Sequence, residues 1–221
     1  MGCIFYFKYA TQRIFLLMSS KGLANRKRGL AMRIIVGISG GSGSIYGISL
    51  LKALKELKVE THLVVSTMGE QVAKQECGVT LEELKGMATY YHDNKDFFAP
   101  IASGSYKVDG MVVVPCSMKT LSAVANGYSD SLLTRACDVT IKERRKLVLV
   151  TRETPLSPVH LENMLKLSKM GVTIFPPAPG FYNNPKTIED IILHITGRIL
   201  DQLGVENNLA YRWQGLVKGG R

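Results

Sequence analysis

A short apolar run that ends in a glycine-rich turn constrains this chain more than any other feature. The run is Arg33-Ile-Ile-Val-Gly-Ile-Ser39, and the turn Gly40-Gly-Ser-Gly43 leads directly into a helical pattern. Such a turn directs free backbone N–H groups and the positive end of a helix dipole at one point, where phosphate binds readily. The spacing matches neither the G-x-G-x-x-G dinucleotide fingerprint nor the Gly-Lys-Ser/Thr of a P-loop. The turn therefore predicts either a phosphate-bearing ligand or a tight connection that binds nothing.

After this turn, strand and helix patterns alternate along the chain. Apolar runs typical of strands recur at 33–39, 60–66, 110–114, 146–150 and 172–175. Helical patterns occupy 44–58, 132–145 and 158–170, and two further helical segments end near residue 76 and start near residue 117. A last helix begins after Thr187, which forms a capping-box pattern with Asp190. These repeated units predict one α/β domain in which helices cover both faces of a doubly wound parallel sheet.

The net charge of +10 is concentrated near the start of the chain. The first 32 residues hold six of the 28 basic residues and no acidic one, which leaves 22 basic and 18 acidic residues in 33–221. The body of the protein is only mildly basic, so a nucleic-acid partner is not expected. The apolar run at 14–18 is too short to span a membrane or to serve as a signal sequence, so no membrane association is expected either.

We expect residues 1–32 to be a basic, poorly ordered extension and residues 33–221 to form the folded domain. An acid-free segment with arginine and serine fits a mitochondrial transit peptide, whereas a non-native extension would leave the protein in the cytoplasm. The four cysteines form no CxxC pair and suit a reducing compartment. The four histidines lie far apart in the sequence, so no metal site is predicted.

Five segments rich in Ser, Thr, Gly and Arg follow directly after expected strands. In doubly wound sheets, ligands bind at the carboxyl ends of the strands, where the strand order switches. All five segments should therefore face one crevice, which predicts where a ligand binds. The segments are Gly40–Gly43, Ser66–Thr67, Cys116–Thr120, Thr151–Thr154 and Pro176–Tyr182.

Three of these segments carry recognisable chemistry. Pro115-Cys-Ser-Met-Lys-Thr120 offers hydroxyls at a helix N-terminus, or simply an N-cap at Ser117. Arg152 can hold a phosphate bidentately, and Glu153 beside it can move a proton. Phe181-Tyr182 ends a stiff proline-rich loop that either walls an aromatic ligand or packs on the core.

Two other basic positions have simple structural interpretations from spacing alone. Lys142-Glu-Arg-Arg145 is typical of a solvated helix end, where basic side chains complement the helix dipole. Arg198 falls at the edge of the apolar stripe of the last helix, where arginine usually keeps its charge in water and its stem on apolar surface.

Seven segments, taken together and in order, resemble the UbiX-type flavin prenyltransferases, long labelled phenylacrylic-acid or 3-octaprenyl-4-hydroxybenzoate decarboxylases. The resemblance extends from about residue 33 to 215 without large gaps. Its segments are Gly37–Gly47, Pro115–Ser122, Asp138–Arg145, Val150–Pro155, His160–Met164, Pro176–Tyr182 and Arg212–Gly215.

The resemblance implies a flavodoxin-like Rossmann fold of three layers that binds FMN and assembles as a homo-oligomer, typically a dodecamer. Members of the family transfer the dimethylallyl group of dimethylallyl phosphate to N5 and then C6 of the flavin, without a metal. The product, prenylated FMN, is passed to a UbiD-type decarboxylase. The resemblance does not distinguish a monophosphate donor from a pyrophosphate donor.

The resemblance also implies roles for individual residues. Those expected to bind FMN are Gly40, Gly41, Ser42, Ser66, Ser117, Met118, Lys119, Thr120 and Arg152. Those expected to hold the prenyl phosphate, across subunit contacts, are Arg135, Lys142, Tyr182 and Arg198. Proton transfer and phosphate departure are expected to involve Ser42, Glu76 and Glu153. Family members often have Ala where this chain has Gly41, a change that a glycine turn should tolerate.

Two other functions remain as alternatives. A flavin-dependent cysteine decarboxylase of the same fold is expected to carry a Pro-x-Met-Asn segment and a histidine after the first strand. This chain has Pro115-Cys-Ser-Met-Lys and no histidine between Arg33 and Glu60. A non-catalytic flavin carrier would need neither the basic cluster nor the Arg152-Glu153 pair.

Overall fold

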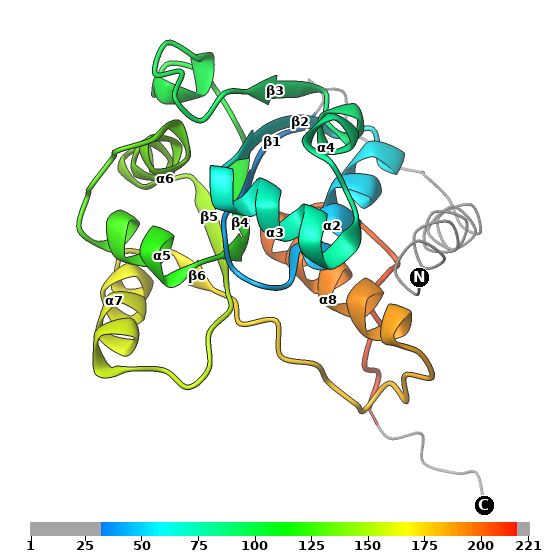
Figure 1. Ribbon diagram of the computed structural model, residues 1–221. Helices are drawn as coiled ribbons and strands as arrows, with labels where there is room; N and C mark the ends of the chain where they lie inside the picture. The colour runs from blue at the N-terminus through cyan, green and yellow to red at the C-terminus, as the bar shows by residue number, and fades with distance from the viewer. Residues whose placement is uncertain (1–31, 216–221) are drawn as a thin grey trace, which may run out of the picture.

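The structure is a computed structural model that describes residues 32–215, so the extension expected at 1–32 lies outside the described residues apart from Met32. Six strands form one sheet in the order β3-β2-β1-β4-β5-β6, and all neighbouring strands are parallel (Figure 1). The strands are β1 (Arg33–Ile38), β2 (Glu60–Val65), β3 (Tyr90–His92), β4 (Gly110–Cys116), β5 (Lys146–Thr151) and β6 (Thr173–Ile174).

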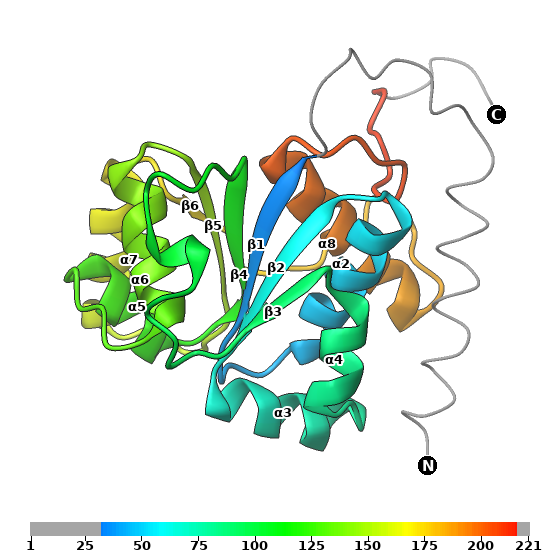
Figure 2. The same cartoon turned by 90° about the horizontal axis from the view of Figure 1, so that it is seen from above.

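Helices cover both faces of this sheet and give the three layers that were predicted. Figure 2 shows α5, α6 and α7 on one face and α2, α3, α4 and α8 on the other. Their bounds are α2 (Ser44–Glu56), α3 (Thr67–Cys77), α4 (Leu81–Met87), α5 (Met118–Ala125), α6 (Leu132–Lys142), α7 (Pro158–Lys169) and α8 (Ile188–Leu203), with a 3-10 turn η1 at Pro100–Ala102.

The strand order confirms the doubly wound, flavodoxin-like Rossmann fold. Without the three-residue edge strand β3, the remaining strands have the flavodoxin order 2-1-3-4-5, and β3 extends it to the 3-2-1-4-5-6 order of Rossmann sheets. The order switches between β1 and β4, because the chain first builds outward to β3 and then returns to the other side of β1. A ligand is therefore expected outside the carboxyl ends of β1 and β4.

The core explains why the strands are apolar along their whole length. Each face of the sheet packs against a separate helix layer, so β4 is buried at every position from Gly110 to Cys116. On one face Leu50 and Leu54 of α2 pack with Ile199 of α8, and all three side chains are fully buried. Burial on both faces keeps the strand ends, and thus the loops that follow them, in fixed positions.

Three short elements of the structure were not predicted from the sequence, and some elements end at other residues than predicted. The elements not predicted are α4, β3 and η1, although Thr80 and Glu83 form a capping box at the start of α4. Strand β4 continues through Pro115 to Cys116, with its register on β5 shifted after Val113 because proline has no N–H to donate. The capping box of Thr187 with Asp190 at the start of α8 is confirmed.

Candidate active site

The glycine-rich turn lies between β1 and α2 at the carboxyl edge of the sheet, as predicted. Gly43 is the N-cap of α2 and has a φ of 101°, a left-handed conformation that favours glycine. Gly40 is needed because a Cβ there would lie 2.6 Å from Cβ of Met68. At Gly41 a Cβ would lie 3.4 Å from Cβ of Pro115, close to ordinary contact. The space at position 41 therefore agrees with the expectation that alanine is tolerated.

Glu76, near the end of α3, reaches the same turn. Its carboxylate accepts hydrogen bonds from the backbone N–H groups of Gly43 (2.9 Å) and Ser44 (3.0 Å). The expectation that the whole turn presents free N–H groups is therefore wrong for these two donors, because a carboxylate occupies the N-terminus of α2. The N–H groups of Gly40–Ser42 have no hydrogen-bond partner among residues 32–215 and remain available to an anion.

Two further helix N-termini lie at this edge. Ser66 caps α3 by accepting a hydrogen bond from the N–H of Gly69 at 3.0 Å. Ser117 caps α5 by accepting one from the N–H of Thr120 at 3.3 Å, which confirms the simpler interpretation of this serine. Each hydroxyl has a second lone pair and its own proton, so capping does not prevent contact with a ligand.

A pocket of about 330 Å³ opens between these helix ends. Of the residues expected to bind FMN, it is lined by Gly40, Ser66, Ser117, Lys119 and Thr120. Gly41 and Ser42 are in the turn beside it, and Met118 packs half-buried against the core under α5. The pocket lies where the strand order switches, so the fold and the local chemistry agree on one location.

Ser39 fixes the distance between the two loops that flank this pocket. Its hydroxyl donates to the carbonyl oxygen of Pro115 at 2.9 Å and accepts from the N–H of Ser117 at 2.8 Å. Ser39 is almost fully buried. Its role is thus to join the end of β1 to the end of β4.

Some residues that line the pocket were not predicted from the sequence, including Asn94, Asp130 and Ser131. Asn94 holds the start of α6, because its backbone carbonyl accepts from Leu132 (2.8 Å) and its side-chain carbonyl from Leu133 (3.0 Å). The signal that could have identified Asn94 is its position just after β3. Had β3 been recognised in the sequence, the segment after it would have been expected in the crevice with the other strand ends.

Arg152 and Glu153 follow β5 at the same edge and are both exposed. The backbone N–H of Arg152 donates to the carbonyl of Cys116 at 3.3 Å and anchors the segment to the end of β4. The guanidinium of Arg152 has no hydrogen bond or ion pair within the described part of the chain. The Glu153 carboxylate accepts a local bond from the N–H of Thr154 at 3.1 Å. Both charges are therefore accessible beside the pocket rather than within its lining.

Arg135 and Lys142 lie on α6. Arg135 donates to the carbonyl of Ala102 (3.2 Å) and to the Asp138 carboxylate (2.8 Å). Lys142 is exposed at the end of α6 and pairs with Glu143. Because α6 ends at the amino edge of the sheet, Lys142 is far from the pocket of its own chain.

Tyr182 and Arg198 lie on the opposite face of the sheet, around α8. The hydroxyl of Tyr182 is 3.2 Å from Nε2 of His194, one helical turn before Arg198. Arg198 pairs with Asp201 at 2.9 Å and is about half exposed. One chain therefore does not bring the four expected phosphate ligands together, since α6 and α8 lie on different faces (Figure 2).

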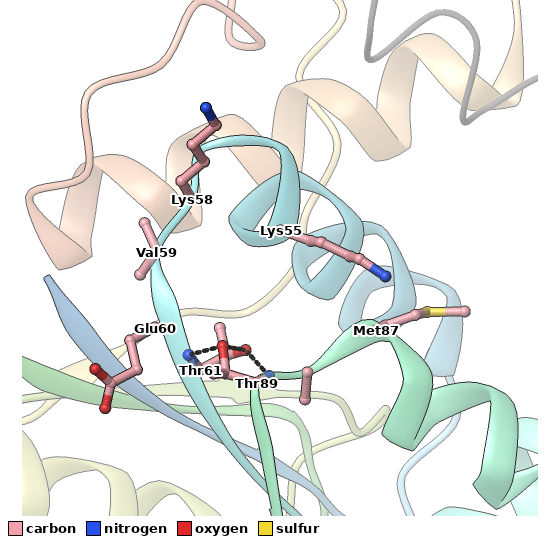
Figure 3. Close-up of a pocket in the computed structure, with 8 residues that line it drawn as sticks. Lys55, Lys58, Val59, Glu60, Thr61, Met87 and Thr89 are labelled. Atoms are coloured by element: carbon pink, nitrogen blue, oxygen red, sulfur yellow. Dashed lines mark hydrogen bonds between the residues drawn. The ribbon is translucent and has the colours of Figure 1, made fainter. Parts of the chain in front are cut away.

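A second pocket, of about 370 Å³, lies at the amino edge of the sheet and contains none of the expected site residues. Figure 3 shows Lys55 and Lys58 around it, and the paired hydroxyls and N–H groups of Thr61 and Thr89 at its base. These two threonines bond each other at 3.1 and 3.0 Å. Their polar groups are thus used to join β2 to the start of β3.

The structure gives little support for a reactive cysteine or a bound metal ion near the site. Cys116 ends β4, and burial raises the pKa of its thiol to about 12, so it is not a thiolate nucleophile. Between Met32 and Gly215, no three His, Cys, Asp or Glu side chains are grouped so that they could hold a metal ion. In the same part of the chain, no helix is long and apolar enough to cross a membrane.

Comparison with known proteins gives a family for this fold and site. The flavoprotein family model matches residues 24–200. Over 182 residues the chain is 53% identical to a UbiX flavin prenyltransferase of Methanocaldococcus jannaschii, covering 82% of this chain and 98% of that protein. Over 184 residues it is 51% identical to a mitochondrial flavin prenyltransferase of Saccharomyces cerevisiae, covering 83% and 76% respectively.

Solved structures agree. A UbiX protein (PadA1) in complex with FMN and dimethylallyl pyrophosphate superposes with a TM-score of 0.83 at 46% identity, covering 85% of this chain and all of that one. A dodecameric FMN-dependent UbiX-like decarboxylase from Escherichia coli O157:H7 superposes with a TM-score of 0.81 at 50% identity, covering 83% of this chain and 100% of that one. The chain belongs to the flavoprotein family and, within it, to the UbiX-type flavin prenyltransferases.

Proposed function

We propose that this protein transfers the dimethylallyl group of dimethylallyl phosphate to N5 and C6 of reduced FMN, and so makes prenylated FMN for a UbiD-type decarboxylase. The observation that carries the proposal is the pocket at the β1/β4 switch point in a chain of this family. The pocket is lined by Gly40 of the turn and by the N-termini of α3, α5 and α6. Family membership supports the reaction, and the pocket supports its location.

The residues around the pocket fit FMN. The unpaired N–H groups of Gly40–Ser42 suit its phosphate, and the hydroxyls of Ser66, Ser117 and Thr120 suit phosphate or ribityl oxygens. Two buried hydroxyls at this edge, Ser44 Oγ and Thr151 Oγ1, have no hydrogen-bond partner among residues 32–215. Bound reduced FMN supplies the nucleophilic atoms N5 and C6.

The protein's own part in the reaction is charge and proton handling. When the C–O bond of dimethylallyl phosphate breaks, negative charge grows on the departing phosphate, and fixed cations such as Arg198 and Lys142 stabilise it. Glu153 is the proton acceptor in this proposal, which is supported by its exposure and by the lack of a cationic partner among the described residues. Ser42 and Glu76, at the turn, complete the proposed catalytic group, and Arg152 holds the flavin phosphate.

We further propose that the phosphate site is shared between subunits of a dodecamer. Arg135 and Lys142 are residues of α6, whereas Arg198 is in α8 and Tyr182 contacts His194 of α8. Because α6 and α8 cover opposite faces of the sheet, we expect a neighbouring subunit to supply one pair. The test is complementation between two inactive variants, Lys142→Ala and Arg198→Ala. Co-expressed mixtures of the two contain sites with both residues intact, so they should regain part of the activity. No recovery in mixed oligomers would rule out the shared site.

Cellular location and partner follow from the same proposal. We place the protein in the cytoplasm, with mitochondria as the alternative if residues 1–31 act as a transit peptide. The recipient of the product is a UbiD-type decarboxylase. Purified protein, incubated anaerobically with reduced FMN and a donor, should activate such a decarboxylase that has been prepared without its cofactor.

The direct test is anaerobic incubation of the protein with reduced FMN and dimethylallyl phosphate, followed by the mass and absorption spectrum of the flavin. The expected product is heavier than FMN by one prenyl unit. A parallel reaction with dimethylallyl pyrophosphate establishes the donor. Flavin that binds and is recovered unchanged would indicate a flavin carrier, and preferential binding of FAD or NAD would contradict the proposal.

A further inference from the structure

A buried histidine links the proposed phosphate ligand Tyr182 to the rest of the fold. His194 lies on α8, is only 7% exposed, and has a hydrogen-bond partner at each ring nitrogen. Its Nε2 is 3.2 Å from the hydroxyl of Tyr182, and its Nδ1 accepts a hydrogen bond from the backbone N–H of Tyr211 at 3.3 Å. His194 thus connects α8, the proline-rich loop and the C-terminal segment at one point.

The backbone contact determines which nitrogen carries the proton. A backbone N–H can only donate, so Nδ1 of His194 must present its lone pair to Tyr211. The proton of the neutral imidazole is then on Nε2, and Nε2–H donates to the hydroxyl oxygen of Tyr182. Tyr182 therefore receives a hydrogen bond from His194, and its own O–H proton is left to point elsewhere.

The surroundings of His194 keep the ring neutral. Burial lowers the pKa of His194, and the positive charges of Arg198 and Arg212 lower it further. A doubly protonated ring would also lose the bond from Tyr211, because Nδ1 would then be a donor. The C-terminal segment that supplies Tyr211 is itself held firmly, since Arg212 makes two bonds to Asp201, at 2.6 and 2.8 Å.

We propose that His194 is a positioning residue that orients the Tyr182 hydroxyl as a hydrogen-bond donor toward the phosphate of the prenyl substrate. The inference rests on the proposed function, in which Tyr182 and Arg198 hold that phosphate. A phosphate oxygen only accepts hydrogen bonds, so a tyrosine whose proton was already given to a histidine would be a poor ligand. His194 prevents that arrangement, because its Nε2 is a donor.

Two substitutions separate the two contacts of His194. His194→Asn places an amide oxygen near the position of Nδ1, so it keeps the bond from Tyr211 and loses the one to Tyr182. His194→Gln places an amide N–H near the position of Nε2, so it keeps the bond to Tyr182 and loses the other. A purely structural role would depend on both contacts, whereas the proposed role depends on the contact with Tyr182.

The measurement is the Kd of dimethylallyl phosphate on FMN-loaded protein with the flavin oxidised, followed by KM and kcat with reduced flavin. Tyr182→Phe should weaken binding about 10- to 100-fold, as expected for a lost bond to a charged group. His194→Asn should weaken it about 3- to 10-fold and raise KM with little change in kcat, while His194→Gln stays within about twofold. The double variant Tyr182→Phe/His194→Asn should bind as weakly as Tyr182→Phe alone, because His194 acts through Tyr182.

The failure of this inference can be told apart from failure of the proposed function. If Tyr182→Phe leaves the Kd unchanged, Tyr182 is not a phosphate ligand and the role of His194 fails with it, whereas the proposed prenyl transfer fails only if the flavin incubated with dimethylallyl phosphate is recovered unchanged. If Tyr182→Phe weakens binding but His194→Asn does not, or if the two effects add, only the role of His194 is overturned. A nitrogen-15 NMR spectrum of histidine-labelled protein gives a second readout independent of activity. It should show the His194 proton on Nε2, and a proton on Nδ1 would overturn the inference.

Discussion

The carboxylate of Glu76 accepts a hydrogen bond from the backbone N–H of Gly43 at 2.9 Å, across the glycine-rich turn that opens α2. A side chain from the end of α3 thereby occupies a helix N-terminus that would otherwise attract a ligand phosphate. The same carboxylate bonds the N–H of Ser44, so it holds the turn and α3 together. Glu76 thus stabilises the turn while lying beside the site where it is proposed to assist the reaction.

Replacing Glu76 with alanine should lower stability, because two N–H donors of the turn lose their acceptor. The expected loss is about 1–2 kcal/mol, as for a removed helix cap, and it should appear as a lower Tm. Glu76→Gln keeps an acceptor oxygen and should lose about half as much. Gln75→Ala, at an exposed neighbouring position on α3, is the matched control. Equal Tm values for Glu76→Ala and the control would contradict the capping role.

The two glycines that precede Ser42 should respond differently to alanine. Gly40→Ala forces a Cβ to within 2.6 Å of Cβ of Met68, which cannot move without its backbone, so about 1–3 kcal/mol of stability should be lost together with FMN affinity. In Gly41→Ala the new Cβ would lie 3.4 Å from Cβ of Pro115, so stability and FMN affinity should both stay nearly unchanged. Melting curves and FMN titration of both variants test this. Similar losses in the two variants would contradict the steric difference between positions 40 and 41.

Glu153→Gln tests the proton-transfer role. The amide keeps the size of the side chain and its local bond from Thr154, but it cannot accept a proton. FMN binding should stay near normal, while prenylation slows by about 10²–10⁴-fold. Glu206→Gln, at another exposed carboxylate away from the pocket, should leave the rate unchanged. Unchanged rates in Glu153→Gln would show that this carboxylate has no catalytic role.

Arg198→Ala distinguishes a phosphate ligand from a structural arginine. Asp201, the partner of Arg198, also bonds Arg212 and Asn207, so it remains paired when Arg198 is removed. Stability should change little, and the KM for dimethylallyl phosphate should rise. Arg212→Ala should do the opposite and lower the Tm, because it frees the C-terminal segment. A lower Tm with unchanged kinetics in Arg198→Ala would favour the purely structural interpretation of its sequence position.

Stability should fall as the pH drops below about 6.5, because of two paired histidines, the buried His62 and the partly buried His92. Burial lowers the pKa of His62 below 6.5 despite the nearby Glu60 carboxylate, and it also lowers the pKa of His92, whose Nε2 lies 2.9 Å from Nδ1 of His62. Below their ordinary pKa these side chains bind protons in the unfolded state more readily than in the folded state, so acid favours unfolding. Above about pH 8 neither state binds these protons, so the two histidines no longer contribute to the pH dependence of the Tm.

The check is the Tm between pH 8 and pH 5, for the protein and for His62→Gln. The variant should start from a lower Tm at pH 8, because the contacts of His62 with His92 and Glu60 are altered. Between pH 6.5 and 5 its Tm should fall less steeply than that of the unchanged protein. An identical slope would exclude His62 as the source of the acid sensitivity.

Local patterns were enough to predict most of the fold, and the reason is visible in particular elements. Strand β4 is apolar at nearly every position because both of its faces are buried, and Thr187 with Asp190 marks the start of α8 through backbone bonds within one turn. Such signals depend on neighbouring residues alone. Strand β3 was missed because its three residues owe their conformation to pairing with β2, a contact between distant parts of the chain.

The sequence by itself determined the alternation of strands and helices, the glycine turn after β1 and the motifs that identify the family. These features depend on residue type and spacing, which the chain carries without reference to its fold. Only the tertiary structure decided that Glu76 occupies the N-terminus of α2, that Asn94 borders the pocket, and that the Tyr182 hydroxyl lies within hydrogen-bond distance of His194. It also placed α6, which contains Lys142, and α8, which contains Arg198, on opposite faces of the sheet. Each of these is a contact or a separation between segments far apart in the chain, and such geometry exists only once the two helix layers have packed on the sheet.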